Sequence, residues 1–233
     1  MRMIPDHTGR FSYRPYFDVA ELDAECEGAV VAFLERLHGK AEFPIDTDDL
    51  TKFLEQEAED LDLYADLSSE GSDVEGVTYF PSQSRPRVRI AKELSARGRE
   101  HRLRTTLTHE WGHVHFHRSL WEGRRAERPL FHWARDAAAW RCHRDDIVGA
   151  PKVDWMEWQA GYACGAILMP HSRLLAVLAA QASPPPGQSG PSVAELIQYV
   201  RQRFNVSTDA ARVRLAQLGL TVAAGPPPLA GGE

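Results

Sequence analysis

The amino-acid sequence predicts an α+β protein that is mainly helical, with a small antiparallel sheet and a helix-turn-helix-like segment near its C-terminal end. Apolar residues recur at helical spacing over most of the chain, whereas Val74–Phe80 and Val88–Ile90 have the short pattern of strands. A stretch rich in proline, glycine and serine, residues 183–191, divides the helical part. A chain of 233 residues that is 43% hydrophobic can build one substantial core.

The first expected helices precede the sheet. Asp18 is the expected N-cap of a helix whose apolar residues follow a 3.6-residue rhythm: Leu22, Cys26, Ala29, Val30, Phe33, Leu34 and Leu37. A second helix is expected from about Thr47 to Ala58. After the strands, a polar and basic connector from Ser95 to Thr106 leads into Leu107 and a histidine-rich helix.

The second half of the chain predicts further helices. An apolar helical segment begins at Glu157 and ends at Met169-Pro170, and another lies near Leu174–Ala180. Two apolar stripes follow, Val193, Leu196, Ile197, Val200 and Phe204, then Ala211, Leu215 and Leu218, with Ser207 as the cap between them. These patterns predict a domain over residues 1–182, a linker over 183–191, a helix-turn-helix-like segment over 192–222 and a disordered tail over 223–233.

The motif His109-Glu110-Trp111-Gly112-His113 indicates the chemistry. Histidines four residues apart on a helix lie roughly 5–6 Å apart on one face, so both imidazoles can reach one metal ion. The glutamate between them can face the open side of that ion and act as a base. His109 and His113 are therefore candidate zinc ligands, and Glu110 is the candidate catalytic residue of a hydrolase.

A catalytic zinc normally takes three protein ligands and leaves a fourth position for water, so a third donor is expected downstream. Zinc endopeptidases with an extended motif have a histidine six residues after the second one, but this position is Ser119. The remaining route is a carboxylate on a later helix. Glu157 is the favoured candidate, because Ala160, Gly161 and other small residues on its helix face allow close approach to the histidine helix. Asp154 is the weaker alternative.

Together these motifs resemble those of the ImmA/IrrE-like family of zinc metallopeptidases. The resemblance rests on Thr105–Thr108 before the histidine motif, on His117 after it, and on Glu157-Trp158-Gln159-Ala160 leading to Ala166-Ile167-Leu168-Met169-Pro170. It covers roughly Val74 to Leu220 and implies a zincin-like metallopeptidase fold for the larger domain. His117 fits the pattern of this family, and we favour a hydrogen-bonding role for it over that of a direct ligand.

Carried over residue by residue, the resemblance implies that His109, His113 and Glu157 bind zinc and that Glu110 is the base. The chain departs from the family at Gly161, where an asparagine is usual, and in a longer interval between His117 and Glu157. The longer interval suggests an inserted lid or regulatory element. The residue that stabilises the tetrahedral intermediate is left open among three candidates, Tyr162, His143 and His115.

The three cysteines, Cys26, Cys142 and Cys164, cannot form a fully paired disulfide framework, and with a signal-free N-terminus they predict a reducing, cytoplasmic location. Cys26 and Cys164 fit buried helix positions. Cys142 lies beside His143 in a polar part of the long interval. A loop carrying this thiol could fold over the site, so Cys142 is a candidate fourth ligand that holds zinc in a latent state; a free thiol without a role is the alternative.

The charge of the chain is unevenly distributed. Residues 85–144 contain 15 Arg or Lys against 6 Asp or Glu, a net charge of +9 in a chain whose total is −6. The same segment contains Trp111, Trp121, Trp133 and Trp140. Basic groups interleaved with aromatic residues suit single-stranded DNA, which is the predicted activator. The alternative is a solvated basic face that balances acidic neighbours.

The leading hypothesis is a cytoplasmic zinc endopeptidase that cleaves one specific protein. The resemblance implies that the substrate is a helix-turn-helix transcriptional repressor, whose cleavage induces genes in a stress, phage or mobile-element response. A DNA-binding regulator with a structural zinc site and a general peptidase are the alternatives, because Arg201, Arg203, Arg212 and Arg214 do not decide whether the C-terminal segment binds DNA. No membrane span is expected, since the apolar runs are far shorter than about 20 residues.

Overall fold

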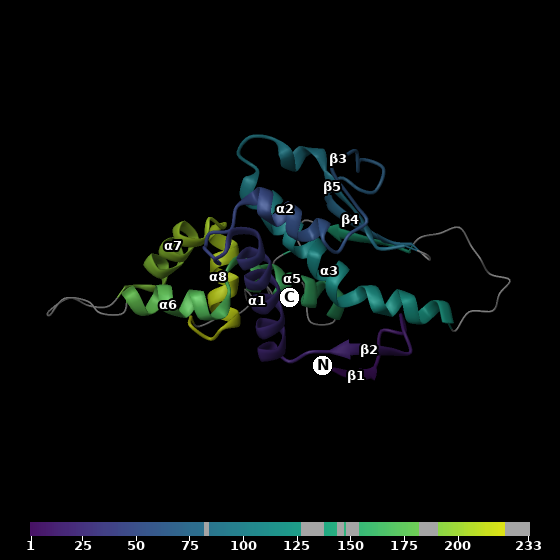
Figure 1. Ribbon diagram of the computed structural model, residues 1–233, viewed down its shortest axis with the longest axis horizontal. Helices are drawn as coiled ribbons and strands as arrows, with labels where there is room; N and C mark the ends of the chain where they lie inside the picture. The colour runs from purple at the N-terminus through teal and green to yellow at the C-terminus, as the bar shows by residue number, and fades with distance from the viewer. Residues whose placement is uncertain (82–83, 127–137, 144–146, 148–153, 182–190, 222–233) are drawn as a thin grey trace, which may run out of the picture.

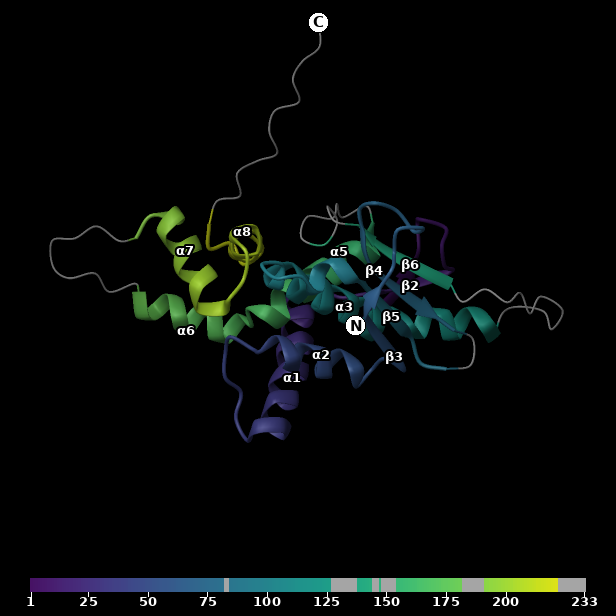
Figure 2. The ribbon, with the colours of Figure 1, turned by 90° about the horizontal axis from the view of Figure 1, so that it is seen from above.

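The computed structural model describes residues 1–81, 84–126, 138–143, 147, 154–181 and 191–221 (Figure 1). Two central helices, α3 (Glu100–Ala126) and α5 (Trp155–Leu168), pack against each other over much of their length. A four-stranded sheet lies on one side of α3, and the three helices α6, α7 and α8 gather at the end of the molecule away from the sheet (Figures 1 and 2). The α+β class expected from the sequence is confirmed.

The four-stranded sheet has the order β3-β5-β4-β6 and mixes parallel with antiparallel pairs. Its members are β3 (Asp60–Ala65), β4 (Val74–Phe80), β5 (Arg87–Ala91) and β6 (Ala138–His143). The predicted antiparallel pair of β4 and β5 is present, with Thr78 opposite Val88. β3 adds to β5 in parallel, and β6 adds to β4 in antiparallel. The expectation of a purely antiparallel sheet was therefore incomplete: β3 was not predicted, although Asp60-Leu61-Asp62-Leu63 has the alternation of a strand, and neither was β6.

A two-stranded antiparallel hairpin, β1 (Arg2–Pro5) with β2 (Tyr13–Tyr16), begins the chain. It was not predicted, because each strand is short and contains a proline. In Figure 1 the hairpin lies on the other side of α3 from the four-stranded sheet. Phe17, directly after β2, packs edge-on against Phe116 of α3, with the ring centroids 5.0 Å apart.

The first two helices follow the sequence closely. α1 (Val19–His38) begins at Asp18, whose side chain accepts a hydrogen bond from the Glu21 backbone, and ends at Gly39 in the left-handed conformation. α2 (Thr47–Glu55) is three residues shorter than expected. Leu22, Cys26, Val30, Phe33 and Leu34 of α1 are buried in the main core, as their periodicity predicted.

The histidine helix begins earlier than the sequence suggested. The stretch Ser95–Thr106 was expected to be a connector, but a short 3-10 helix, η1 (Lys92–Ser95), precedes α3, which already starts at Glu100. Arg104 is buried within it and donates to the backbone carbonyls of Ile45 and Asn205. These bonds satisfy a buried guanidinium that looked solvent-facing in the sequence.

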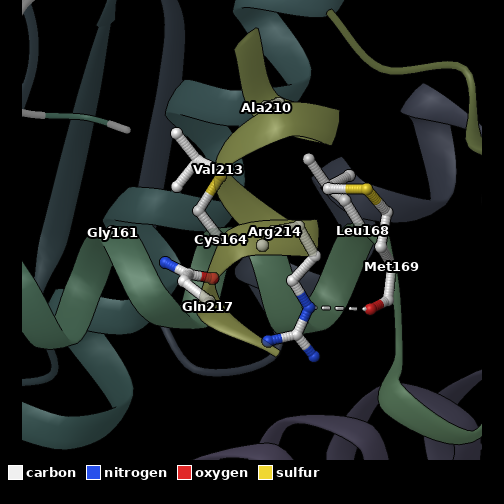
Figure 3. A pocket seen from close by; sticks show the side chains of 9 residues that line it. Gly161, Cys164, Leu168, Met169, Ala210, Val213, Arg214 and Gln217 are labelled. Carbon is white, nitrogen blue, oxygen red and sulfur yellow. Dashed lines mark hydrogen bonds between the residues drawn. The ribbon is translucent and has the colours of Figure 1, made fainter. Parts of the chain in front are cut away.

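The close approach between α3 and α5 depends on Gly112. A Cβ atom at this position would lie 2.9 Å from the Cα of Ala160 and 3.2 Å from the Cβ of Ala163, so a larger residue would push the two helices apart. Gly161, expected on this interface, instead lines a small cavity between α5 and α8 (Figure 3). The small residues therefore work as predicted, except that Ala163 rather than Gly161 faces the histidine helix.

The last three helices are α6 (His171–Gln181), α7 (Val193–Phe204) and α8 (Thr208–Gln217). Asn205 takes the left-handed conformation between α7 and α8, and Ser207 caps α8 as expected. Arg214 of α8 is fully buried, donating to the Met169 carbonyl (Figure 3) and to Asp23 of α1. Leu215 belongs to the same hydrophobic core as Leu22, so α8 packs into the body of the protein.

Among the described residues, no single helix is long and apolar enough to cross a bilayer. The consecutive helices α5 and α6 reach that length only together, and they bend by 53° at the break between them.

Candidate metal centre

Three side chains from α3 and α5 bring their donor atoms together. His109 Nε2 lies 3.0 Å from His113 Nε2 and 3.1 Å from Glu157 Oε2, and His113 Nε2 lies 3.3 Å from Glu157 Oε1. Ligand atoms held at 2.0–2.1 Å by one tetrahedral zinc ion are themselves about 3.3 Å apart. All three residues are buried, so they form a group that could hold a metal ion. The structure therefore joins the three residues that the sequence proposed as ligands.

A cation explains this arrangement better than hydrogen bonds alone. Two imidazole nitrogens and a carboxylate oxygen face the same point, and each of the three offers a lone pair there in its neutral or ordinary ionised form. Burial opposes ionisation of Glu157, but the adjacent His113 and His109 outweigh it and lower the pKa of the carboxylate. An ionised carboxylate beside two imidazoles fits a divalent cation.

Glu110 lies beside this group, between α3 and β4. The hydroxyl of Thr78 donates to its Oε2 atom, and a Cβ at Gly76 would come within 2.2 Å of its Oε1 atom. Glycine at position 76 therefore makes room for the carboxylate. Burial raises the pKa of Glu110, although His113 and His109 and the Thr78 hydrogen bond oppose the rise. The sequence missed Gly76 and Thr78, because nothing in a strand pattern indicates which side chains approach a helix.

A chain of hydrogen bonds fixes the tautomer of His113. The Nε2 atom of Gln159 donates to the backbone carbonyl of Pro15, because a carbonyl can only accept. The Oε1 atom of Gln159 is therefore the atom that faces His117 Nε2, 3.1 Å away, and it accepts a hydrogen bond from this nitrogen. His117 then carries its proton on Nε2 and accepts at Nδ1 from His113 Nδ1, 3.0 Å away. The result leaves the lone pair of His113 Nε2 directed at the candidate metal position.

His117 is neutral in this chain of bonds. Burial, followed by the neighbouring His113, lowers the pKa of His117 well below its ordinary value. The hydrogen-bonding interpretation of His117 agrees with its position, since it contacts His113 and Gln159 and is not one of the residues that converge on the candidate metal position. Sequence reasoning did not find Gln159 or Pro15, which lie 42 and 102 positions from His117.

The face of Glu157 that is turned away from His109 is covered by β6. The indole N–H of Trp140 donates to Glu157 Oε1, and the Trp140 ring lies 6.1 Å from the His113 ring. The guanidinium of Arg10 lies over the indole ring, 4.8 Å from its centroid. Arg10 also binds both oxygens of Asp154 at 2.8 Å. Asp154, the alternative ligand, is thus held in an ion pair outside the metal group.

Cys142 is on strand β6 and not on a loop as expected. It lies opposite Gly76 of β4 and is fully buried beside Glu110. Burial, together with the charges of Glu110 and Glu157, raises the pKa of the thiol well above its usual value, so the metal-free protein holds a neutral thiol here. Among the described residues, the converging donor group contains His109, His113 and Glu157 but not Cys142. Ligation of zinc by Cys142 remains a prediction.

The three candidates for stabilising a tetrahedral intermediate make their hydrogen bonds elsewhere. The hydroxyl of Tyr162 donates to Asp23, and His143 pairs with Asp73 at the surface. His115 bridges Glu57 and Glu25 and stacks on Trp111. The structure brings none of these three side chains into the metal group, and their assignment to that role has no support from its geometry.

Four described basic residues of the segment 85–144 form ion pairs with acidic residues from other parts of the chain. Arg87 pairs with Glu59, Lys92 with Asp66, Arg102 with Glu75 and Arg141 with Glu70. The charge excess seen in the sequence is therefore partly balanced in three dimensions, as the alternative interpretation anticipated. Trp133 and several arginines of this segment lie outside the described residues.

Comparison with models of known protein families and with curated proteins gave no match to this chain.

Proposed function

We propose that this protein is a zinc-dependent endopeptidase. The observation that carries the proposal is the position of Glu110, a buried carboxylate held by Thr78 beside two imidazoles and a carboxylate that converge on one point. Structural zinc sites are usually closed by four protein ligands, whereas catalytic sites have three ligands and a nearby base. Three converging donors and a separate glutamate match the catalytic arrangement.

His109, His113 and Glu157 would hold the zinc ion. Two imidazoles and one carboxylate are a common ligand set for catalytic zinc, and the burial of all three favours a single well-defined geometry. When bound, zinc supplies Lewis acidity toward a water molecule and a substrate carbonyl.

Glu110 is the residue that would accept the proton of the attacking water and pass it to the leaving amine. Its raised pKa brings the carboxylate closer to neutral pH, where a group can both take and release a proton. Thr78 fixes the orientation of one carboxylate oxygen. His117 and Gln159 keep His113 in the tautomer that a metal requires.

The substrate class comes from the sequence. The resemblance to the ImmA/IrrE-like family supports a helix-turn-helix repressor as the protein that is cleaved, in a stress, phage or mobile-element response. A single-stranded DNA activator and a cytoplasmic location are further parts of this proposal, supported by the basic aromatic segment and by the unpaired cysteines.

The direct test uses Glu110→Gln. The purified full chain, loaded with one equivalent of zinc, is incubated with repressors encoded beside its gene, and cleavage is followed by mass spectrometry. Wild-type protein should cut a repressor at one or a few bonds, and Glu110→Gln should lose cleavage by at least about 100-fold while it retains zinc and its melting temperature. Cleavage that survives in Glu110→Gln would exclude the proposed role.

The second candidate function is a DNA-binding regulator with a structural zinc site. It would be favoured by the turn between α7 and α8, but Arg214 of α8 is buried against Asp23 and is unavailable to phosphate. Under this alternative, Glu110→Gln would leave every activity of the protein unchanged, and Arg203→Ala, at an exposed position of α7, would weaken DNA binding.

A further inference from the structure

The groups proposed to perform hydrolysis are closed to a protein substrate. His109, Glu110 and His113 are 0% exposed and Glu157 is 5% exposed. Endoproteolysis requires that a peptide bond come within a few ångströms of such groups. Some part of the chain must therefore leave before a substrate can bind.

Strand β6 supplies the part of this cover that lies over the two carboxylates. Side chains directly opposite each other in a sheet lie on the same face, and Trp140 is opposite Thr78 while Cys142 is opposite Gly76. Since Thr78 and Gly76 both touch Glu110, the two β6 side chains lie on the same face of the sheet as the base. Trp140 binds Glu157 and Cys142 lies beside Glu110, so one short strand covers both carboxylates.

The strand occupies a particular position in the sheet. One edge of β4 is paired with β5, and β6 takes the other edge in antiparallel register from Phe80 to Val74 (Figure 2). An extended peptide can add to the edge of a sheet through main-chain hydrogen bonds, with alternate side chains directed to one face. Any strand paired here would direct alternate residues toward Glu110, as β6 does.

We propose that this edge of β4 is the docking edge for an extended segment of the protein substrate, and that β6 is an internal strand that occupies it. The inference rests on the proposed endopeptidase function and adds to it a binding mode and a mechanism of latency. Affinity comes largely from the backbone, so the edge accepts an unfolded or locally extended segment. Substrate can bind only to molecules in which β6 has left the edge of β4, so the apparent affinity is the intrinsic affinity multiplied by the fraction of such molecules. If β6 occupies the edge in 99% of molecules, the apparent affinity falls about 100-fold.

Arg10 and Asp154 support the occupied state. The guanidinium of Arg10 lies over the Trp140 ring and binds Asp154 at the start of α5. The N-terminal hairpin therefore contacts β6 through Trp140, on the sheet face that also carries Thr78, while Arg141, on the opposite face from Trp140, binds Glu70. These contacts are peripheral to the base and the metal donors, so they can stabilise the occupied state without taking part in hydrolysis.

A reversible covalent lock tests the inference. Tyr79 and Ala139 are opposite each other on the sheet face turned away from Glu110. Opposite residues in antiparallel strands have Cα atoms about 4.5–5.5 Å apart, which a disulfide can bridge. The double variant Tyr79→Cys with Ala139→Cys is oxidised, and cleavage of the repressors encoded beside the gene is measured by mass spectrometry before and after reduction. The two single variants, oxidised in the same way, are the controls.

We expect the oxidised double variant to cleave the repressor at least tenfold more slowly than either control, and reduction to restore the rate. Equal rates in the locked and reduced forms, with Glu110-dependent cleavage in both, would overturn the docking edge and leave the endopeptidase function standing. The native cysteines are buried and are present in all three variants, so they cannot account for a difference between the double variant and its controls.

Hydrogen exchange provides a readout that does not depend on cleavage. In Glu110→Gln, the repressor should increase the exchange of backbone amides in β6 while β4 stays protected, because the substrate strand replaces β6. Loss of β6 protection without cleavage by wild type would support the docking edge and contradict the endopeptidase. Neither cleavage nor a change in β6 exchange would overturn both.

Discussion

Gly76 lies so close to Glu110 that a single methyl group at position 76 would approach the carboxylate oxygen to 2.2 Å. The strand and the helix are 32 positions apart in sequence at the Thr78 contact, yet they share one small space. The absence of a side chain at Gly76 is therefore part of how the base is held.

Gly76→Ala should displace Glu110 from its position beside the metal donors. We expect a loss of proteolytic rate of about 100-fold, since a shift near 1 Å in a catalytic group has an effect of this size. Zinc content should remain close to one equivalent because His109, His113 and Glu157 are not contacted. Gly28→Ala is the matched control, since a Cβ at Gly28 meets nothing within 4 Å. Equal activity in the two variants would show that Glu110 has no fixed position.

The bonds from Pro15 to His113 predict an effect on metal affinity. Gln159→Ala and His117→Ala should each weaken zinc binding by about 10–100-fold, because His113 is no longer held in the tautomer that leaves Nε2 free. The double variant should lose no more than the more affected single variant, since both act through one chain of bonds. Competition with a chromophoric chelator measures the affinities, and additive losses would contradict the relay.

His115→Gln is the control for that experiment. His115 lies two positions from both His113 and His117 but is directed at Glu57 and Glu25. Its substitution should leave zinc affinity within about twofold of wild type, because its ring makes no contact with the bonds that orient His113. A large loss in this variant would mean that general disturbance of α3 explains the effect.

His115 also predicts a pH dependence of stability. Burial lowers the pKa of its imidazole, but hydrogen bonds and charges from Glu57 and Glu25 outweigh burial and raise it above 6.5. A raised folded-state pKa means that the ion pairs contribute fully below the unfolded pKa and that this contribution is lost as pH rises through the folded pKa. The free energy of unfolding of wild type should exceed that of His115→Gln most at pH 5.5, and the difference should shrink toward pH 8.5 in urea titrations. A difference that grows with pH would contradict this sign.

The latent state with Cys142 on zinc has its own signature. If the thiol binds the metal, cobalt-substituted protein should show a thiolate-to-cobalt charge-transfer band that Cys142→Ala lacks, and this variant should have higher basal proteolysis. Cys164→Ala, at a buried position on α5, is the control. If basal proteolysis does not rise and the cobalt spectrum is unchanged, Cys142 is a buried thiol of β6 without a role at the metal.

Activation by single-stranded DNA is tested by adding oligonucleotides to the zinc-loaded protein. Stimulation of cleavage and binding should both decline as salt rises, because phosphate contacts release counterions. The ion pairs of Arg87, Lys92 and Arg102 with carboxylates limit how many charges are available for these contacts. Proteolysis indifferent to every oligonucleotide would remove DNA from the proposal.

The sequence was most informative about residues of a single helix, because their spacing determines which side chains lie close together. His109, Glu110 and His113 form a site through the helical repeat alone, and Glu157 was found because a catalytic metal needs a third donor. The sequence could not reveal partners that meet through the sheet, such as Thr78 and Trp140, since their strands have no motif. β6 was missed for the same reason, and with it the fact that the site is covered.

The net charge of a sequence segment was the least reliable guide to the surface of the folded protein. A net excess of +9 over residues 85–144 suggested an exposed basic surface, but ion pairing is decided by the fold: Arg87 and Lys92 meet acids at the two ends of β3, and Arg102 meets Glu75 of β4. Arg104 and Arg214 are likewise of a residue type that is usually found at the surface, yet both are buried in the core. Counting charges along a chain does not tell which of them remain unpaired.

The carbonyl of Pro15 is the outermost fixed point of the bonds that end at His113. Fragments trimmed to the motif-bearing part of the chain would lose this anchor while retaining every ligand. Such shortened proteins would release zinc during purification and be mistaken for proteins that never bound it, so metal analysis is meaningful only with the first sixteen residues attached.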